Sequence, residues 1–378
     1  MNETKAPAQA DKVSLRALLT LAVFALALGG FFLLNLIVPP PEVLESERRL
    51  PATLPPLSAE TLLSGEYMQK FEDYANDRFV FRDALRTVRT VAVLDVFLQT
   101  DKSGLYIGQA GAGQFEKINR ISLGQSVEKI NLLAGGLEGL NLYVSFVPDK
   151  SVYAGRPLPG FDPAEARQTI TQALPNLTFV DLTDALSAED FYFTDLHWDQ
   201  ARLGGVLDAL GRSMGFPGGM DLAFTPYVPG DFQGVYTGQI ALPLPPDAMT
   251  VMTGGPLDGV RVTYLNDRTG QMEDGPLYDF DAFQGRDPYD LFLRGVQPLI
   301  VLENPAAGTG RELYLFRDSF SSSLAPLLTP YYDKITLIDL RYMDSRILPA
   351  LVTFTPGSDV LFLYSSQILN HAEVLLVK

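Results

Sequence analysis

Two segments of the chain carry side chains suited to proton transfer and nucleophilic attack. The first, FYFTDLHW at residues 191–198, places Asp195 and His197 two positions apart, after an aromatic run that predicts a strand ending at Thr194. In extended backbone, side chains at i and i+2 project to the same side. The carboxylate can then accept from Nδ1 of the imidazole and leave Nε2 free as a general base. A purely structural histidine held by a local aspartate is the alternative.

The second segment, RELYLFRDSFSSSLAPLL at residues 311–328, predicts a buried strand over 312–316 and a helix after Ser319. A serine at this turn lies near a helix N-terminus, where backbone N–H groups and the helix dipole stabilise a developing oxyanion. The position suits a nucleophile and an N-cap serine equally well. The Gly-x-Ser-x-Gly pattern of the nucleophile elbow does not occur in this segment.

The fold must bring these two segments together. Beyond residue 100, short apolar runs such as LNLYVSFV at 140–147 alternate with helical patterns. This alternation predicts an α/β fold with a mainly parallel sheet flanked by helices, whose active site forms at the carboxyl ends of the strands. Between about residues 214 and 297 the sequence is rich in Gly, Pro and Asp, and predicts an insertion of loops and minor strands.

The composition limits the chemistry that the chain can perform. It has no cysteine and only two histidines, so disulfides, thiolate metal sites and multi-histidine zinc centres are not expected, and no metal or cofactor is predicted. The net charge is −16, the acidic residues are scattered, and no basic stripe is present. These features argue against a nucleic-acid partner. With 47% hydrophobic residues in 378, the chain is expected to form a packed globular body.

An apolar stretch at residues 17–38 predicts one transmembrane helix, about 30 Å long. Lys5, Lys12 and Arg16 precede it, and prolines with acidic residues follow it. The charge difference predicts a cytoplasmic tail at 1–16, a single-pass anchor in the cell membrane and an extracytoplasmic main domain. A signal peptide cleaved near residue 27 is the alternative, but mostly apolar residues continue past that point.

Two segments separate the anchor from the main domain, which is expected at residues 101–378. Residues 39–57 contain six prolines and predict an extended tether. Residues 58–100 predict amphipathic juxtamembrane helices, one with Tyr67, Phe71 and Tyr74 on a single face. Packing against the main domain is the favoured interpretation of these apolar faces, and partner binding is the alternative.

After the anchor, most of the sequence resembles the bacterial DHHW family, which is itself similar to the SGNH hydrolase-like domain of alginate O-acetylation proteins. The resemblance is carried by LSGEYMQKFEDYANDRFVFRD, SGLYIG, VPDKSVYAG, FTDLHWDQARLGG, DFQGVYTGQ and LFRDSFSSSLAPLLTPYYDKITLIDLRY. One departure concerns the two adjacent histidines of the family's name motif, because Leu196 stands in the first position. His197 matches the catalytic histidine in the Thr-Asp-x-His-Trp motif of the alginate proteins.

The resemblance implies an SGNH-hydrolase-like sheet with Ser319 as nucleophile, His197 as base and Asp195 as the acid that orients it. Arg317 replaces the glycine that precedes Asp-Ser in ordinary SGNH esterases, which puts a glycine-based oxyanion hole in doubt.

Three basic residues are expected to contact substrate: Arg317, Arg341 and Lys150. Arg341 follows a predicted strand and is suited to neutralising a carboxylate or phosphate, with a surface arginine as the alternative. Lys150 follows another predicted strand. His371, near the C-terminus, is expected to be an ordinary surface or packing residue.

The resemblance implies O-acyl transfer, most simply of acetyl groups, to a cell-surface or secreted polysaccharide. It also implies a possible membrane-bound O-acyltransferase partner that exports the acyl group, while the lipid bilayer holds the anchor. Two alternatives stay open at this point. One is an esterase that removes acetyl groups from cell-envelope glycans, and the other is a non-catalytic glycan-binding scaffold.

Overall fold

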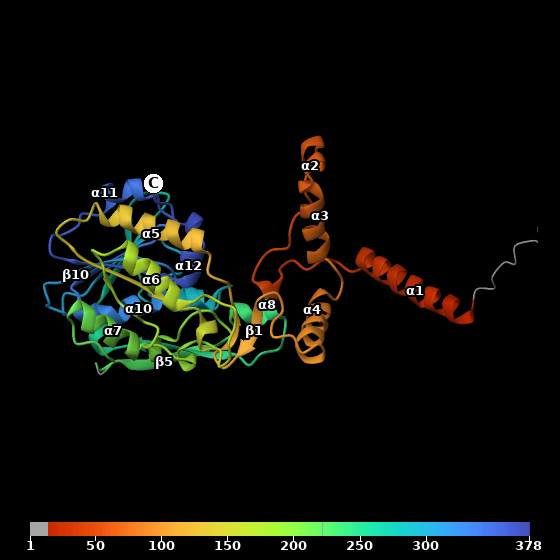
Figure 1. Ribbon diagram of the computed structural model, residues 1–378, viewed down its shortest axis with the longest axis horizontal. Coiled ribbons are helices and arrows are strands. Elements are labelled where there is room, and N and C mark those ends of the chain that lie inside the picture. The colour runs from red at the N-terminus through yellow and green to blue at the C-terminus, as the bar shows by residue number, and fades with distance from the viewer. Residues whose placement is uncertain (1–13, 221) are drawn as a thin grey trace, which may run out of the picture. The chain divides into compact units, whose positions relative to one another are not determined.

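The computed structural model describes residues 14–220 and 222–378 (Figure 1). The chain divides into two units, and the division falls between Arg89 and Thr90. The expected first residue of the main domain, 101, therefore lies within the second unit. Most of the expected cytoplasmic tail, including Lys5 and Lys12, lies outside the described residues.

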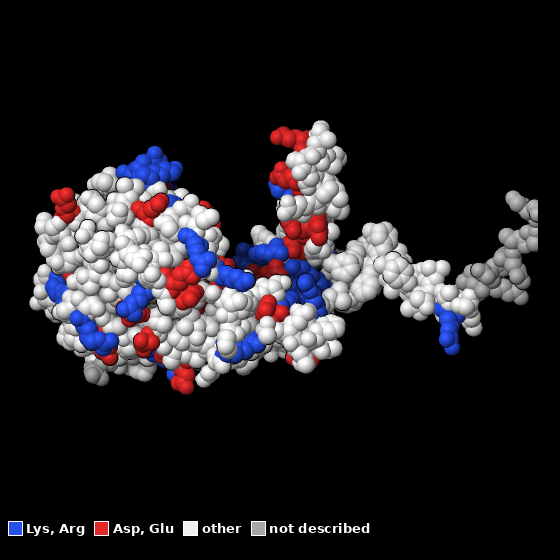
Figure 2. Space-filling model, viewed as in Figure 1, with Lys and Arg blue, Asp and Glu red and all other residues white. Residues whose placement is uncertain are grey.

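The first unit begins with helix α1, Leu15–Ile37, which covers nearly all of the expected membrane span. Ser14 caps it, because its Oγ accepts from the N–H of Ala17 at 3.2 Å. By length and composition, α1 is the one helix among the described residues that qualifies to cross a membrane. Figure 2 shows that charged side chains are lacking over most of its surface.

The proline-rich tether folds back onto its own unit. Arg49 donates to both carboxylate oxygens of Asp77, at 2.6 Å each, and a 3-10 turn forms at Glu45–Glu47. The segment is therefore held by charge-assisted hydrogen bonds and is not simply extended. The helices that follow are α2 (Ala59–Leu63), α3 (Glu66–Asp77) and α4 (Arg82–Val91), and a short π-helix at Ala92–Val96 continues α4.

An eight-stranded mixed sheet forms the centre of the second unit, in the order β4-β3-β12-β10-β11-β9-β7-β8. The first five strands in this order run parallel: β4 (Thr178–Phe179), β3 (Asn141–Val147), β12 (Asp359–Ser365), β10 (Glu312–Arg317) and β11 (Lys334–Ile338). The last three pair antiparallel: β9 (Leu299–Glu303), β7 (Arg261–Leu265) and β8 (Met272–Gly275).

The α/β class is thus as predicted, but the expectation of a mainly parallel sheet needs correction. For the pair β7 and β8 the reason lies in connection length. Residues 266–271 alone join β7 to β8, and so short a connection gives an antiparallel hairpin, because parallel neighbours need a crossover of a dozen residues or more.

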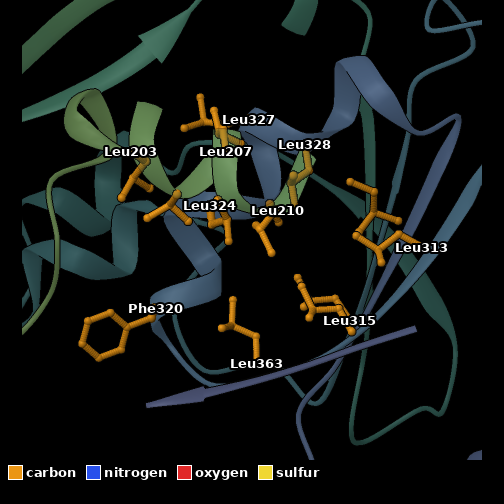
Figure 3. Packing of buried hydrophobic residues seen from close by; sticks show 14 of the residues in the cluster. Leu203, Leu207, Leu210, Leu313, Leu315, Phe320, Leu324, Leu327, Leu328 and Leu363 are labelled. Atoms are coloured by element: carbon orange, nitrogen blue, oxygen red, sulfur yellow. The ribbon is translucent and has the colours of Figure 1, made fainter. Parts of the chain in front are cut away.

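Helices cover both faces of the sheet, and strand β10 shows how its side chains are shared between them. Leu313 and Leu315 belong to one hydrophobic core, while Tyr314 and Phe316 belong to the other. Figure 3 shows the first core, where leucines of the sheet meet those of two helices. The helices of the first core are α7 (Gly204–Met214) and α10 (Phe320–Leu328), and those of the second are α5 (Arg120–Ala134), α6 (Pro163–Ala173), α11 (Leu348–Leu351) and α12 (Ser366–Asn370).

The region at about residues 214–297, predicted to be an insertion of loops and minor strands, has more regular structure than expected. Its strands β7 and β8 extend the main sheet, while β5 (Thr225–Phe232) and β6 (Asp247–Thr253) form a separate antiparallel pair. Its helices are short: α8 (Val235–Ile240) and α9 (Phe280–Phe283). A third hydrophobic cluster, which includes Phe232, Val251 and Phe292, holds this region together. A hairpin of β1 (Leu105–Gly108) and β2 (Gly111–Gln114) precedes α5.

Candidate active site

Ser319 occupies the turn between β10 and α10, at the carboxyl edge of the parallel strands. It stands at the N-cap position, but its hydroxyl makes no capping hydrogen bond. Asp318 serves the turn instead, because its carboxylate accepts from the N–H groups of Phe320 at 3.1 Å and Ser365 at 2.6 Å. The Ser319 hydroxyl is directed to Nε2 of His197, at 2.8 Å.

Asp195 and His197 are brought together by a tight turn and not by the extended strand that the sequence predicts up to Thr194. Only an isolated bridge forms here, between Phe191 and Trp198. Oδ1 of Asp195 accepts from the backbone N–H of His197 at 3.1 Å and lies 2.7 Å from Nδ1 of its ring. A short acidic side chain that bonds backbone two residues on replaces extended structure with a turn.

The carboxyl group of Asp195 is buried, and burial alone would raise its pKa. The hydrogen bond and charge of His197, with N–H groups from Val235 and His197, outweigh burial and hold the pKa well below its ordinary value. Asp195 is therefore ionised at neutral pH and fixes a proton on Nδ1 of the imidazole. Nε2 is left as an acceptor that faces the serine hydroxyl, which is the arrangement that proton removal requires.

Aromatic rings hold the imidazole in this orientation. The ring of Tyr289 stacks on His197 with centroids 3.7 Å apart and an angle of 5° between the planes. The phenol of Tyr289 donates to Oγ of Ser323 at 2.8 Å, and the indole of Trp198 donates to the same oxygen at 2.9 Å. The ring of Phe320 lies 4.9 Å from the imidazole. Ser323 thus joins helix α10 to both aromatic residues.

The insertion supplies further supports that the sequence did not reveal, and Tyr289 itself comes from it. Val235 donates its N–H to Oδ2 of Asp195 at 3.1 Å, and Gly234 donates to Oγ1 of Thr194 at 2.7 Å. Both residues lie in DFQGVYTGQ, one of the stretches that carry the family resemblance, which is the one signal that could have marked them. Asp247 accepts from the N–H of Thr194 at 2.7 Å.

Lys150 lies beneath the Asp195 turn and is 3% exposed. Its ammonium donates to the carbonyl oxygens of Ala112, Tyr192 and Asp195 at 2.7, 2.7 and 2.8 Å. Burial lowers the pKa of Lys150 to about 8. All three donors of the ammonium are in use within the protein, so Lys150 positions the Asp195 backbone. Its contact with substrate stays a prediction.

Arg317 ends strand β10, and Arg341 lies in the turn that follows the neighbouring strand β11. Arg317 is 1% exposed and donates to Oγ of Ser322 at 2.6 Å and to the carbonyl of Gln297 at 3.4 Å. Arg341 makes a two-pronged ion pair with Asp339, at 2.9 and 2.6 Å, and retains some exposure. Substrate contacts by both arginines stay predictions, and the carboxylate of Asp339 already balances the charge of Arg341.

His371 lies apart from this constellation. It is partly exposed, and its imidazole pairs with Glu116 at 2.9 Å and Glu373 at 3.2 Å. Within residues 14–220 and 222–378, no group of three or more His, Asp or Glu side chains is placed to hold a metal ion.

An open groove of about 520 Å³ lies at the same edge of the sheet, where β9 begins and β7 ends. Its walls include the half-exposed ring of Tyr342 and the exposed side chain of Val296. Gln297 also lines it, and the Gln297 carbonyl accepts from Arg317. One wall of the groove is therefore hydrogen-bonded to Arg317, two residues before Ser319. The remaining lining residues are Tyr264, Leu265, Asn266, Asp267, Arg268, Glu273, Arg294 and Pro298.

The fold and the site define a mixed α/β protein with a serine, a histidine and an aspartate in hydrogen-bonded sequence at the carboxyl edge of its sheet. The sequence matches no protein-family model and no curated protein. Solved structures do match.

A DHHW family protein from Eubacterium siraeum DSM 15702 superposes with a TM-score of 0.59 at 19% identity, over 72% of this chain and 95% of that one. PatB1 from Bacillus cereus, solved with a sulfonyl adduct, gives a TM-score of 0.55 at 18% identity, over 72% and 96%. A second structure of PatB1 gives 0.52 at 18% identity, over 70% and 96%. The resemblance to the DHHW family is thus confirmed at the level of the fold.

Proposed function

We propose that this protein is an SGNH-hydrolase-like O-acyltransferase, held at the outer face of the cell membrane by α1, that acetylates a cell-surface or secreted polysaccharide. One observation carries the proposal: the Ser319 hydroxyl, Nε2 of His197 and the Asp195 carboxylate form a continuous hydrogen-bonded chain. A buried, ionised carboxylate behind the imidazole gives the site the parts that acyl transfer through a serine ester requires.

The reaction divides into two halves. As Oγ of Ser319 attacks the acyl carbonyl of the donor, Nε2 of His197 takes the hydroxyl proton and then gives it to the departing donor group. A sugar hydroxyl next loses its proton to Nε2 and attacks the serine ester, and the proton returns to Ser319 when the sugar ester is released. Asp195 stabilises the imidazolium in both halves. Such base catalysis contributes a rate factor on the order of 10² to 10⁴.

The start of α10 supplies the charge stabilisation. The Ser319 N–H has no acceptor among the described residues, so this donor is available to the oxyanion. The nine-residue helix α10 directs the positive end of its dipole toward the same turn. Arg317 lies buried beneath the turn and supports it, in the place where SGNH esterases have a glycine.

We place the polysaccharide in the groove beside the site. Strands in a sheet are about 4.8 Å apart, so the ends of β9 and β7 lie about 10 to 15 Å from the end of β10. A glycan that lies over Tyr342 can then present a neighbouring hydroxyl to Ser319. An open groove with one exposed aromatic ring and several polar side chains suits an extended sugar polymer.

The solved structures with the same fold support a nucleophilic site. One of the two PatB1 structures carries a sulfonyl adduct, and sulfonyl reagents form adducts with nucleophilic side chains. A membrane-bound O-acyltransferase that delivers the acyl group through the bilayer fits the proposed location of α1, and we retain it as the partner.

The test uses a fluorophosphonate probe on the full chain in detergent. Labelling is expected for the unaltered protein, and it is expected to disappear in Ser319→Ala and in His197→Ala. Ser321→Ala is the matched control, because Ser321 lies two residues further along the same segment, is fully buried, and has no hydrogen-bond partner for its Oγ in the described structure. An unaltered chain that takes no label would favour the non-catalytic scaffold.

A second measurement separates transfer from hydrolysis. Acetate release and ester formation on sugar are followed with p-nitrophenyl acetate as donor, with and without oligosaccharide acceptors. Transfer predicts that an acceptor diverts acetyl groups from water into sugar esters, and that Tyr342→Ala weakens this diversion while leaving the first acylation unchanged. Acetate release that no acceptor alters would instead indicate an esterase.

A further inference from the structure

A short loop of the first unit is bonded to the last turns of α1. Oδ1 of Asn35 accepts from the N–H of Val80 at 2.9 Å. The ring of Phe79 stacks on that of Phe31, with centroids 5.7 Å apart and 24° between the planes. Asn35 also donates to the carbonyl of Phe31 at 2.8 Å, so its side chain is held at both ends. The loop is therefore fixed at a defined height along α1.

That height lies inside a membrane if α1 crosses one. The 23 residues of α1 span about 35 Å, only slightly more than the roughly 30 Å of bilayer hydrocarbon. Phe31 precedes the end of α1 at Ile37 by six residues, which corresponds to about 9 Å along the axis. A ring stacked on Phe31 cannot then lie in bulk water. Phe side chains are typical of the apolar face of segments that lie at the membrane–water boundary.

Beyond the loop, the apolar surface continues on α4. Leu85 and Val88 are three residues apart and share one face of the helix, and Phe81 immediately precedes its first residue, Arg82. Phe81 is 61% exposed and Val88 is 64% exposed. Within the first unit these side chains are exposed. An exposed apolar surface of this kind calls for an apolar partner.

Part of the charge on the same helix is paired within its unit. Arg82 and Arg86 pair with the carboxylate of Glu47 at 2.7 and 3.0 Å. Burial would raise the pKa of Glu47, but the hydrogen bond and charge of Arg82, assisted by Arg86, hold it below its ordinary value. Paired charges lower the cost of placing this segment near a low-dielectric phase.

We infer that residues Phe79–Phe81 and the Leu85 and Val88 side chains of α4 lie in the boundary between headgroups and acyl chains, in the leaflet from which α1 emerges. The partner of this surface is lipid. This location requires the proposed membrane crossing of α1 and is independent of catalysis. Interfacial helices of this type bury their apolar face about 5 to 10 Å below the headgroups.

The test is fluorescence quenching of Phe81→Trp in the full chain, in phosphatidylcholine nanodiscs with and without lipids brominated near the top of their acyl chains. The natural chain has one tryptophan, Trp198, which is fully buried, so the unaltered protein gives the background. Thr87→Trp is the matched control, because residue 87 lies on another face of the same helix, about 130° around the axis from the midpoint of Leu85 and Val88. Phe79→Trp is a second variant should Phe81→Trp alter the thermal unfolding of the chain.

Brominated lipid is expected to quench the new tryptophan at 81 or 79 at least about twofold more than that at 87, because interfacial burial brings one helix face to the acyl chains. Equal quenching at 81 and 87 would overturn the inference, as would a shielded but unquenched tryptophan, which would indicate a protein partner. A chain that does not stay with the nanodiscs would also overturn the inference, because it would show that α1 does not cross the membrane. Fluorophosphonate labelling of the same samples reports on catalysis separately.

Discussion

Oγ of Ser319 lies 2.8 Å from Nε2 of His197, although 122 residues separate the two in the sequence. Two independent turns produce this contact. The serine is fixed by the strand-to-helix turn after β10, and the imidazole is fixed by the Asp195 turn. The serine hydroxyl faces an acceptor nitrogen only while Asp195 keeps the proton on Nδ1 of His197. Replacing Asp195 by asparagine changes this hydrogen bond and hardly changes the shape of the side chain.

Asp195→Asn is expected to slow fluorophosphonate labelling by about 10³ to 10⁴-fold. The amide can donate to Nδ1 of His197, and this stabilises the tautomer in which Nε2 carries the proton and cannot accept one from Ser319. Labelling rate constants for the variant and the unaltered chain measure the effect. Asp199→Asn is the control, because Asp199 caps a 3-10 turn through the N–H of Ala201 and does not contact the imidazole. If the labelling rate of Asp195→Asn falls by less than tenfold, Asp195 does not orient His197 as proposed.

The local sequence marked the serine, the histidine and the aspartate as candidates, and the family resemblance assigned their roles, which stay predictions. The structure brings the three side chains into one hydrogen-bonded chain. Asp195 and His197 stand two positions apart, and Ser319 stands between a buried strand and a small-residue helix. The local backbone was predicted less well. An extended strand was expected up to Thr194, but the Asp195 side chain bonds its own backbone and forms a turn.

What the sequence could not supply comes from contacts between distant segments. Tyr289 lies in the insertion, where apolar periodicity is poor, and nothing near it in the sequence indicates a ring that stacks on an imidazole. The antiparallel pairing of the last three strands was missed for a related reason. Strands β7 and β8 are short and lie in Gly- and Asp-rich sequence, so their pairing depends on the neighbouring β9.

Tyr289 is expected to act as a positioning residue for His197. Tyr289→Leu removes the planar partner of the imidazole and is predicted to slow labelling by about 10 to 100-fold, because small displacements of a base are costly. Tyr289→Phe keeps the stacked ring and loses only the hydrogen bond to Ser323, so labelling is expected within about threefold of the unaltered rate. Labelling that falls equally in the two variants would show that the phenol, and not the stacking, matters.

Gly234 is expected to tolerate no side chain. A Cβ at this position would lie 2.2 Å from the carbonyl oxygen of Thr194 and 2.5 Å from the N atom of Asp195. Because the contacts are with backbone, Gly234→Ala must displace the Asp195 turn, and we expect a loss of about 1 to 3 kcal/mol of stability together with slower labelling. Gly124→Ala, at an open helical position, is the control: its labelling rate should be unchanged, and its stability should rise by about 0.5 to 1 kcal/mol because alanine favours the helix. A normal labelling rate in Gly234→Ala would show that the turn can shift without harm.

Lys150→Met is expected to destabilise the protein by about 2 to 4 kcal/mol, because it leaves three buried carbonyl oxygens without a donor. Lys129→Met is the matched control, since Lys129 donates to two carbonyls, of Ala372 and Leu375, in a partly exposed position. Its cost should be smaller, at about 1 kcal/mol. Urea unfolding of the full chain in detergent gives both values, and equal costs would contradict the burial argument.

The pKa of Lys150 also predicts a pH dependence. The difference in the free energy of unfolding between the unaltered chain and Lys150→Met should change with pH. Burial lowers the pKa of Lys150 in the folded protein to about 8, below the ordinary value of 10.5. Between these two pH values the unfolded chain holds a proton that the folded chain has released, so stability rises with pH across this window. The free energy of unfolding of the unaltered chain, measured relative to Lys150→Met, should therefore increase from pH 8 to pH 10.5. A difference that stays flat would mean that the three carbonyl acceptors keep the ammonium protonated against the effect of burial.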